Sequence, residues 1–127
     1  MSDRLILFVE DDPTLQLVGR IALRNLGYNC EIVATGEKAV ERSLDDIALI
    51  FMDVGLPGID GRDATKLIRE REAKENRKHT PIIALTGHAI REQCLEAGMD
   101  DYLQKPALME ELGLMINKWI EPDLIAE

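Results

Sequence analysis

The sequence ALIFMDVGLPG occupies residues 48–58, and its two halves have different characters. The first five residues are all apolar, as expected of a β-strand that is buried on both faces of a sheet. Asp53 follows directly, and the turn-forming residues Gly55, Pro57 and Gly58 come next. This stretch therefore predicts a buried strand that delivers a carboxylate to a tight loop.

Short apolar runs of the same kind recur along the chain. Residues 5–9 and 82–85 are uniformly apolar, and residues 30–33 and 102–103 are weaker candidates for strands. Amphipathic stretches between these runs predict helices over about 13–26, 35–43, 61–75, 90–97 and 107–120. Five strands that alternate with five helices predict an α/β fold, a doubly wound five-stranded parallel sheet with helices on both faces.

The helical spacing also predicts which side chains share one face of each helix. Pro13 suits a first helical turn and Asp12 can cap it, while Gly27 ends that helix. The positions predicted to share a face are Leu15, Val18, Ala22 and Leu26 in the first helix, Ala64, Leu67 and Ile68 in the third, and Leu108, Leu112, Met115, Ile116 and Trp119 in the last.

Composition narrows the possible classes of protein. The chain has 127 residues and a formal net charge of -9, which suits one domain and argues against a nucleic-acid or anionic-membrane surface. No apolar run approaches the roughly 20 residues that cross a bilayer, and the N-terminus does not read as a signal peptide. Cys30 and Cys94 lack disulfide or metal spacing. We expect one cytoplasmic domain over 1–127, with 121–127 as a C-terminal tail or the start of a linker.

Polar residues follow four of the predicted strands. Glu10, Asp11 and Asp12 come after the first strand and Asp53 after the third, while Thr86 and Lys105 follow the fourth and fifth. Parallel strands of a doubly wound sheet end at one edge, where such folds place their ligand site. Clustered carboxylates favour a hard cation such as Mg²⁺, and a carboxylate can act as a nucleophile. Together with a lysine and a hydroxyl, they form a coherent site for phosphoryl transfer to Asp53.

Four motifs at these strand ends resemble those of the response-regulator receiver family. They are VEDDP at the first strand end, FMDVGLPGIDG around Asp53, PIIALTGHA with Thr86, and AGMDDYLQKP with Lys105. The resemblance covers essentially residues 4–120. It implies a flavodoxin-like (βα)5 fold and a receiver domain of a two-component or phosphorelay system.

The resemblance also implies a role for each matching residue. Asp53 is similar to the phosphoacceptor, and Asp11 and the backbone carbonyl of Gly55 to direct metal ligands, with Glu10 acting nearby through water. Asp12 is either a further acidic neighbour of the metal or mainly a helix cap. Thr86 resembles the hydroxyl that moves toward the phosphoryl oxygen, Lys105 its ion-pair partner and Tyr102 the switching aromatic. The Lys105–Pro106 peptide bond is similar to one that is cis in the family.

The chain departs from the family pattern in three places. Gly87 stands where alanine or serine is more usual, and Gly55 offers no side chain beside the acceptor. Because residue 55 has no side chain, we hypothesise that attacking water is less obstructed and that the phosphoryl group is short-lived. The segment 86–98 is about one helical turn shorter than is common in the family, which leaves the mode of output open.

The predicted function is that of a phosphoacceptor rather than an enzyme, apart from Mg²⁺-dependent self-phosphorylation and dephosphorylation. A histidine kinase or histidine phosphotransfer domain would donate the group, and the face built from the fourth helix, fifth strand and fifth helix would signal to a downstream protein. Its motifs resemble receivers of hybrid sensor kinases most, so it is either a stand-alone regulator or part of a hybrid kinase. The main alternative is a receiver-like protein-binding module that does not switch. A phosphatase with an aspartyl nucleophile would need a second Asp two residues after Asp53, where this chain has Gly55. An FMN binder is disfavoured because Glu10, Asp11 and Asp12 would repel its phosphate. A P-loop nucleotide hydrolase is excluded because the sequence has no P-loop motif.

Overall fold

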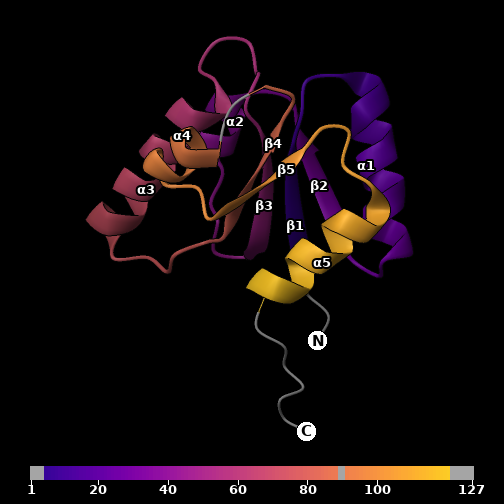
Figure 1. The fold of residues 1–127 in the computed structure, drawn as a ribbon. Coiled ribbons are helices and arrows are strands. Elements are labelled where there is room, and N and C mark those ends of the chain that lie inside the picture. The colour runs from indigo at the N-terminus through magenta and orange to yellow at the C-terminus, as the bar shows by residue number, and fades with distance from the viewer. Residues whose placement is uncertain (1–4, 89–90, 121–127) are drawn as a thin grey trace, which may run out of the picture.

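The computed structural model describes residues 5–88 and 91–120 (Figure 1). Strands and helices alternate along this part of the chain, as the sequence predicts. Their bounds are β1 Leu5–Val9, α1 Pro13–Asn25, β2 Asn29–Val33, α2 Gly36–Glu41, β3 Ile47–Asp53, α3 Gly61–Glu75, β4 Ile82–Thr86, α4 Arg91–Glu96, β5 Asp101–Gln104 and α5 Met109–Trp119. Of the predicted segments, the start of the fourth helix near residue 90 and the tail 121–127 lie outside the described residues.

The five strands form one parallel sheet in the order β2-β1-β3-β4-β5. The chain winds from β1 outward to β2, returns to β3 on the other side of β1, and then continues to β4 and β5. The strand order therefore reverses between β1 and β3, which opens a crevice at their carboxyl ends. This confirms the predicted doubly wound, flavodoxin-like α/β fold.

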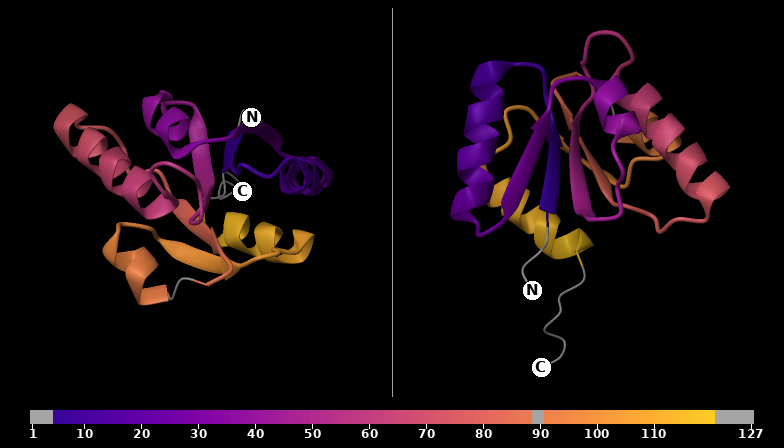
Figure 2. Two further views of the ribbon diagram at one scale, coloured as in Figure 1. Left: turned by 90° about the horizontal axis from the view of Figure 1, so that it is seen from above. Right: turned by 180° about the vertical axis from the view of Figure 1, so that it is seen from behind.

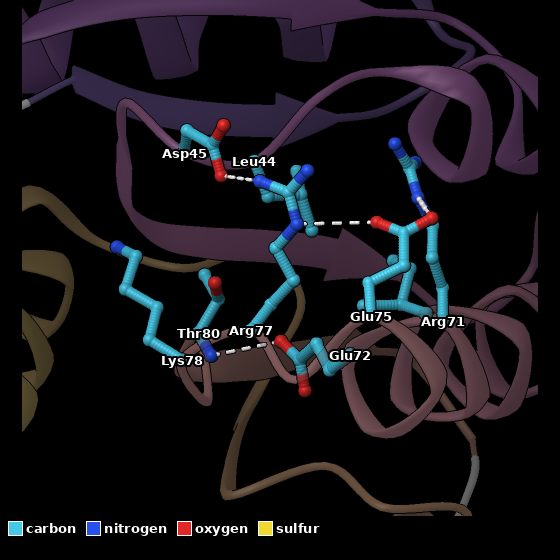
Figure 3. Close-up of a pocket in the computed structure, with 9 residues that line it drawn as sticks. Leu44, Asp45, Arg71, Glu72, Glu75, Arg77, Lys78 and Thr80 are labelled. Carbon is cyan, nitrogen blue, oxygen red and sulfur yellow. Dashed lines mark hydrogen bonds and ion pairs between the residues drawn. The ribbon is translucent and has the colours of Figure 1, made fainter.

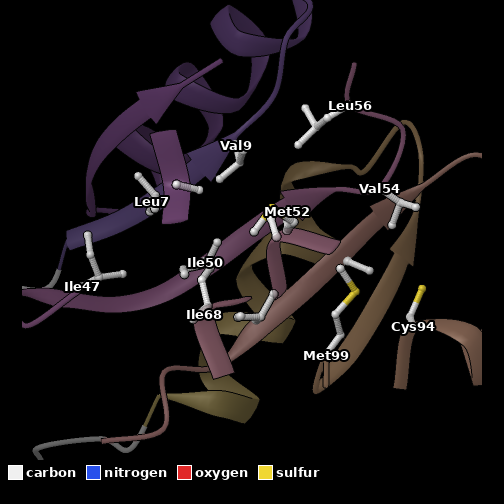
Figure 4. Packing of buried hydrophobic residues seen from close by; sticks show 14 residues of the cluster. Leu7, Val9, Ile47, Ile50, Met52, Val54, Leu56, Ile68, Cys94 and Met99 are labelled. Atoms are coloured by element: carbon white, nitrogen blue, oxygen red, sulfur yellow. The ribbon is translucent and has the colours of Figure 1, made fainter. Parts of the chain in front are cut away.

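Helices cover both faces of the sheet, so two hydrophobic clusters form (Figure 2). On one face, Ala39 of α2, Ile68 of α3 and Cys94 of α4 pack with Leu7, Met52 and other strand residues (Figure 4). On the other face, Leu23 of α1 and Ile116 of α5 pack with Phe8 and Phe51. The three central strands β1, β3 and β4 are buried on both faces, which explains why their sequences are almost uniformly apolar, whereas the edge strands β2 and β5 are partly exposed and carry polar residues.

Three of the predicted core positions are wrong. Val18 is 51% exposed and Leu67 is 41% exposed, although both lie at helical spacing from buried neighbours. In α1, Gly19 packs against the ring of Phe8 so closely that a Cβ atom would lie 2.5 Å from it. This contact turns Gly19, Ala22 and Leu23 toward the sheet and leaves Val18 outside.

The other two errors have local causes. In α3 the buried stripe runs through Ala64, Thr65 and Ile68, and Thr65 donates a hydrogen bond to the carbonyl of Gly61 at 2.8 Å. Leu67 lies on the flank of that stripe. Leu108 is 58% exposed because it is the N-cap residue of α5 and has extended backbone angles, so it does not share the face of the helix that follows.

Candidate functional site

The carboxyl ends of β1, β3, β4 and β5 surround one open cleft, as the sequence predicts. It is lined by Glu10, Asp11, Asp12, Leu15, Asp53, Val54, Gly55, Leu56, Asp60, Arg62, Thr86, Gly87, His88, Gln93 and Lys105. Every acidic, hydroxyl and lysine residue that the strand-end pattern singles out is therefore in this cleft.

Three carboxylates come together at the reversal point between β1 and β3. Glu10, Asp11 and Asp53 each offer an oxygen, and these oxygens lie within 4.8 Å of one another. Glu10 and Asp53 are only 1% and 3% exposed, whereas Asp11 is exposed to solvent. Negative charges this close repel one another, and oxygen donors in this number suit a hard divalent cation such as Mg²⁺.

Lys105 bridges two of these carboxylates. Its Nζ lies 3.2 Å from Glu10 Oε1 and 3.3 Å from Asp53 Oδ2. Its backbone is held as well, because the N–H of Lys105 donates to the carbonyl of Thr86 at 2.8 Å. The Lys105–Pro106 peptide bond that follows is cis, in agreement with the resemblance.

Burial and charge shift two pKa values in this cluster. The pKa of Glu10 is raised. Burial is the largest cause of this rise, and the negative charge of Asp53 adds to it. For Lys105, burial alone would lower the pKa, but the charges of Asp53 and Glu10 outweigh it and raise the pKa. Lys105 therefore remains a cation beside the two carboxylates.

Asp53 is held in place by the loop that follows it and by the start of α3. The N–H of Gly55 donates to Asp53 Oδ1 at 3.0 Å, and the N–H of Gly61 donates to the carbonyl of Val54 at 3.0 Å. A Cβ atom at Gly61 would lie 2.3 Å from the Asp53 carbonyl oxygen. The glycine lets α3 begin directly on the backbone of the acceptor candidate, so that the side chain of Asp53 stays in a defined position.

Thr86 and Tyr102 lie on adjacent strands next to the cleft. Thr86 is buried, and its Oγ1 accepts a hydrogen bond from the N–H of His88 at 3.1 Å. Tyr102, which pairs in register with Ala84, is half-buried. Both side chains line a second hollow beside the cleft, together with Gln104, Arg91 and other residues. The two candidates for a coupled switch thus face a common space.

Asp12 differs from its two acidic neighbours. Its side chain accepts hydrogen bonds from the N–H groups of Thr14 and Leu15, at 2.8 and 3.3 Å. It caps α1, as one of the two readings from sequence proposed, and it is not among the three clustered carboxylates. Its own N–H donates to Glu10 Oε2 at 3.1 Å, which helps to orient that buried carboxylate.

The sequence did not single out Arg62 or Gln93, although both line the cleft. Arg62 lies in the first turn of α3 and Gln93 in α4, so the two approach the site from helices rather than strand ends. A usable signal for Arg62 was Asp60, two residues earlier. Asp60 is the N-cap residue of α3, so it fixes where this helix begins and puts Arg62 in its first turn.

A separate hollow lies at the opposite, amino-terminal edge of the sheet, beside the end of α3 (Figure 3). Its lining charges pair with one another: Arg77 contacts Asp45 and Glu75, and Glu72 accepts a hydrogen bond from the N–H of Thr80 at 2.9 Å. These contacts tie the segment before β4 to α3 and to the segment before β3. We therefore assign this hollow a structural role.

The sequence also matches a known protein family. The response regulator receiver domain family matches residues 6–117. The chain is 39% identical over 118 residues to the sensor protein GacS of Pseudomonas syringae pv. syringae, and 36% identical over 121 residues to the hybrid signal transduction histidine kinase F of Dictyostelium discoideum. These matches cover 90% and 91% of this chain but only 13% and 11% of the relatives, so the chain spans a small part of their length.

Solved structures of receiver domains are also similar to this chain. The receiver domain of a sensor histidine kinase from Pseudomonas aeruginosa PAO1, which has a magnesium ion in its active-site cleft, shares 44% identity with a TM-score of 0.78, covering 91% of this chain and 96% of that one. The receiver domain of the Saccharomyces cerevisiae response regulator Ssk1, solved with the histidine phosphotransfer protein Ypd1, shares 29% identity with a TM-score of 0.83, covering 91% and 88%. Within the described residues, no helix is both long and apolar enough to span a membrane.

Proposed function

The chain belongs to the response regulator receiver domain family, and from this membership we propose that Asp53 accepts a phosphoryl group from a phosphohistidine with the help of Mg²⁺. The observation that carries the proposal is the position of Lys105. Its Nζ lies between Glu10 and Asp53, in a cleft that also holds the carboxylate of Asp11. One nucleophile, one cation and a set of metal ligands thus meet at a single point.

The described residues fit a bound Mg²⁺. Asp11 and Asp53 would hold the ion directly, with the backbone carbonyl of Gly55 as a third ligand and Glu10 acting through water. When bound, the ion would neutralise negative charge on the phosphoryl oxygens. Asp11 is the exposed member of the cluster, so it would be the first ligand that an entering cation meets.

The transfer follows from these positions. An oxygen of Asp53 would attack phosphorus and form an acyl phosphate, while the bond from phosphorus to the donor nitrogen breaks and its electron pair stays on the imidazole. Lys105 would follow the transferred group and neutralise one phosphoryl oxygen, and the Thr86 hydroxyl would bind another. Because Lys105 already contacts Asp53 at 3.3 Å, only a small displacement is needed.

The donor would be a histidine kinase or a histidine phosphotransfer domain. This proposal is supported by the similarity to sensor and hybrid histidine kinases and to a receiver solved with a phosphotransfer protein. The similarity to hybrid histidine kinases favours the proposal that this chain comes from a hybrid kinase rather than from a stand-alone regulator. A cytoplasmic location fits the two free cysteines, Cys30 and Cys94, since free thiols are typical of a reducing compartment.

Family members are in general phosphoacceptors. We propose that this chain has no enzymatic activity beyond its own Mg²⁺-dependent phosphorylation and dephosphorylation. Phosphorylation would draw Thr86 inward, let Tyr102 follow into the hollow that both line, and shift the α4-β5-α5 face between two populations that a downstream protein distinguishes.

The deciding experiment is the intact mass of the chain after incubation with acetyl phosphate, with and without Mg²⁺. We expect one added phosphoryl group that requires both Mg²⁺ and Asp53, so that Asp53→Asn abolishes it. Asp45→Asn is a matched control, because Asp45 is an exposed aspartate at the other edge of the sheet.

A short-lived phosphoryl group could escape this measurement, so beryllofluoride binding is measured in parallel. If neither beryllofluoride nor Mg²⁺ binds, the chain is the non-switching binding module instead. Phosphorylation that persists in Asp53→Asn would show that another residue is the acceptor.

A further inference from the structure

Arg62 stands at the wall of the cleft, between the phosphorylation site and α4. It lines the cleft together with Asp53 and Lys105, and it also lines a neighbouring groove with Lys66 and Glu96. The start of α3, one residue earlier, lies directly on the Asp53 backbone. Arg62 is therefore a second basic residue, besides Lys105, that lines the cleft in which Asp53 lies.

The guanidinium of Arg62 is only loosely held. Its Nη1 donates to Gln93 Oε1 at a long 3.3 Å, and its Nη2 lies 3.6 Å from Asp60 Oδ2. Its Nε is buried but has no hydrogen-bond partner among the residues that the structure describes. A cation with one long hydrogen bond to a neutral acceptor, one distant carboxylate and an unused donor can gain from a closer anionic partner.

α4 is a short helix with few anchors. Cys94 is the one buried residue of α4, and among the residues that the structure describes, the hydrogen bond from Arg62 to Gln93 is the side-chain hydrogen bond that joins α4 to α3. The charge of Arg62 reaches this helix, because it opposes the rise that burial causes in the pKa of Cys94. Loss of the Gln93 contact would therefore loosen α4 more than a single hydrogen bond would loosen a long helix.

We propose that Arg62 is a latch that holds α4 through Gln93 in the resting protein and releases it when a phosphoryl group on Asp53 attracts the guanidinium into the cleft. The proposal rests on the proposed function, since it needs the phosphorylated state. It assigns Arg62 a positioning role that is distinct from that of Lys105, which already contacts Asp53 at 3.3 Å.

The latch makes two variants behave oppositely. Arg62→Ala removes the cation that the phosphoryl group attracts, so the affinity for beryllofluoride with Mg²⁺ should fall by roughly two- to fivefold, the range of a half-exposed ion pair. Gln93→Ala removes the hydrogen bond to α4 and leaves the 3.6 Å contact with Asp60 to hold the guanidinium, so the affinity should rise by a similar factor. Lys66→Ala is the matched control, because Lys66 is a cation on the same helix that lines the outer groove but not the cleft.

Hydrogen exchange measured by mass spectrometry reports α4 directly. In the resting protein, both Arg62→Ala and Gln93→Ala should speed exchange in the peptide over residues 91–98, while a peptide from α1 stays unchanged as an internal reference. Beryllofluoride should speed exchange in the wild type and add little in Gln93→Ala. A merely structural role for Arg62 would not produce opposite affinity changes in the two variants.

The outcomes separate the two proposals. If wild-type protein fails to bind beryllofluoride with Mg²⁺, the proposed function fails, and the latch with it. If the wild type binds and both variants shift affinity in the same direction, or neither shifts it, the latch alone is overturned. Unchanged α4 exchange in both resting variants would overturn it as well.

Discussion

The two oxygens of the Asp53 carboxylate have different partners. Oδ1 accepts the N–H of Gly55 at 3.0 Å, and Oδ2 contacts Lys105 at 3.3 Å. These two contacts favour one orientation of the side chain, in which an oxygen of Asp53 lies within 4.8 Å of oxygens of Glu10 and Asp11. A fixed carboxylate loses little further freedom on the way to an in-line attack, which favours phosphoryl transfer.

Gly55 leaves one side of Asp53 open. A Cβ atom there would lie 3.8 Å from Asp53 Oδ1, so a longer side chain can cover the acyl phosphate. We expect Gly55→Asn to slow dephosphorylation severalfold, because water has less access to phosphorus, without loss of Mg²⁺ binding to the carbonyl of residue 55. The measurement is the decay of the phosphorylated mass after removal of the donor. Gly55→Ala should give an intermediate rate, and equal decay in all three proteins would contradict this explanation.

Cys30 should react slowly with alkylating agents despite being half-exposed. Burial raises the pKa of its thiol to about 11, and only the thiolate is nucleophilic. The folded protein should therefore be alkylated at Cys30 about tenfold faster for each pH unit up to about pH 10, with no plateau near the ordinary thiol pKa of about 8.5. Peptide mapping after timed alkylation checks this, with the urea-unfolded chain as the reference. A plateau near pH 9 in the folded protein would refute it.

At the scale of single elements, variants of the two aspartates that follow Glu10 should affect different properties, one the stability of α1 and the other the binding of Mg²⁺. Asp12→Ala removes the cap of α1 and should lower the free energy of unfolding by about 1 kcal/mol, with little change in Mg²⁺ affinity. Asp11→Asn should weaken Mg²⁺ at least about tenfold, with a smaller effect on stability. Urea unfolding in EDTA and calorimetric titration with Mg²⁺ measure the two quantities. Equal loss of Mg²⁺ affinity in both variants would put Asp12 among the ligands.

The start of α3 depends on a close backbone approach. At Gly61 a Cβ atom would lie 2.3 Å from the carbonyl oxygen of Asp53, so Gly61→Ala forces the helix away from β3. We expect a loss of about 1–3 kcal/mol in unfolding free energy and slower phosphorylation, because Asp53 shifts with its backbone. Gly87→Ala is the control, since a Cβ atom there meets nothing within 4 Å. Similar stability for both variants in urea unfolding would show that α3 adjusts freely.

At the scale of the whole molecule, Asp101 ties the last helix to the sheet. Its carboxylate is buried at the start of β5 and accepts hydrogen bonds from Lys118 Nζ at 2.8 Å and from Trp119 Nε1 at 3.0 Å. Burial would raise the pKa of Asp101, but the hydrogen bonds from Lys118, Trp119 and the N–H of Tyr102 together lower it. The ionised form therefore stabilises the folded state.

This sets the pH dependence of stability. A folded-state pKa below the unfolded value of about 3.9 means that the stabilisation is present above that pH and is lost as the pH falls through the lower, folded value. Asp101→Asn should lower the unfolding free energy at pH 7 by about 1–2 kcal/mol, and the difference from wild type should shrink below pH 4. Urea unfolding followed by Trp119 emission measures this. Lys118→Ala should have a smaller effect, because the Lys118 side chain is 60% exposed. A difference that stays constant down to pH 3 would contradict this role.

The sequence alone determined the order of strands and helices, the fold class and the residues at the strand ends. These depend on local information: uniformly apolar runs of strand length, amphipathic spacing, and turn residues such as Gly58 and Gly98. Parallel strands must end at one edge, so the meeting of Asp53, Thr86 and Lys105 followed from their places in the chain. The cap at Asp12 was one of two readings that the sequence left open.

The tertiary structure decided what depends on the rotation and depth of packed elements. Spacing alone placed Val18 and Leu67 on core faces, but the contact of Gly19 with Phe8 and the Ala64–Ile68 stripe turned them outward. Likewise, only packing shows that Asp12, whose role the sequence left open, stays outside the cluster of Glu10, Asp11 and Asp53, and that Arg62 reaches the cleft from a helix. The physical reason is that periodicity identifies neighbours along an element, whereas the direction of a side chain is set by contacts with residues distant in the sequence.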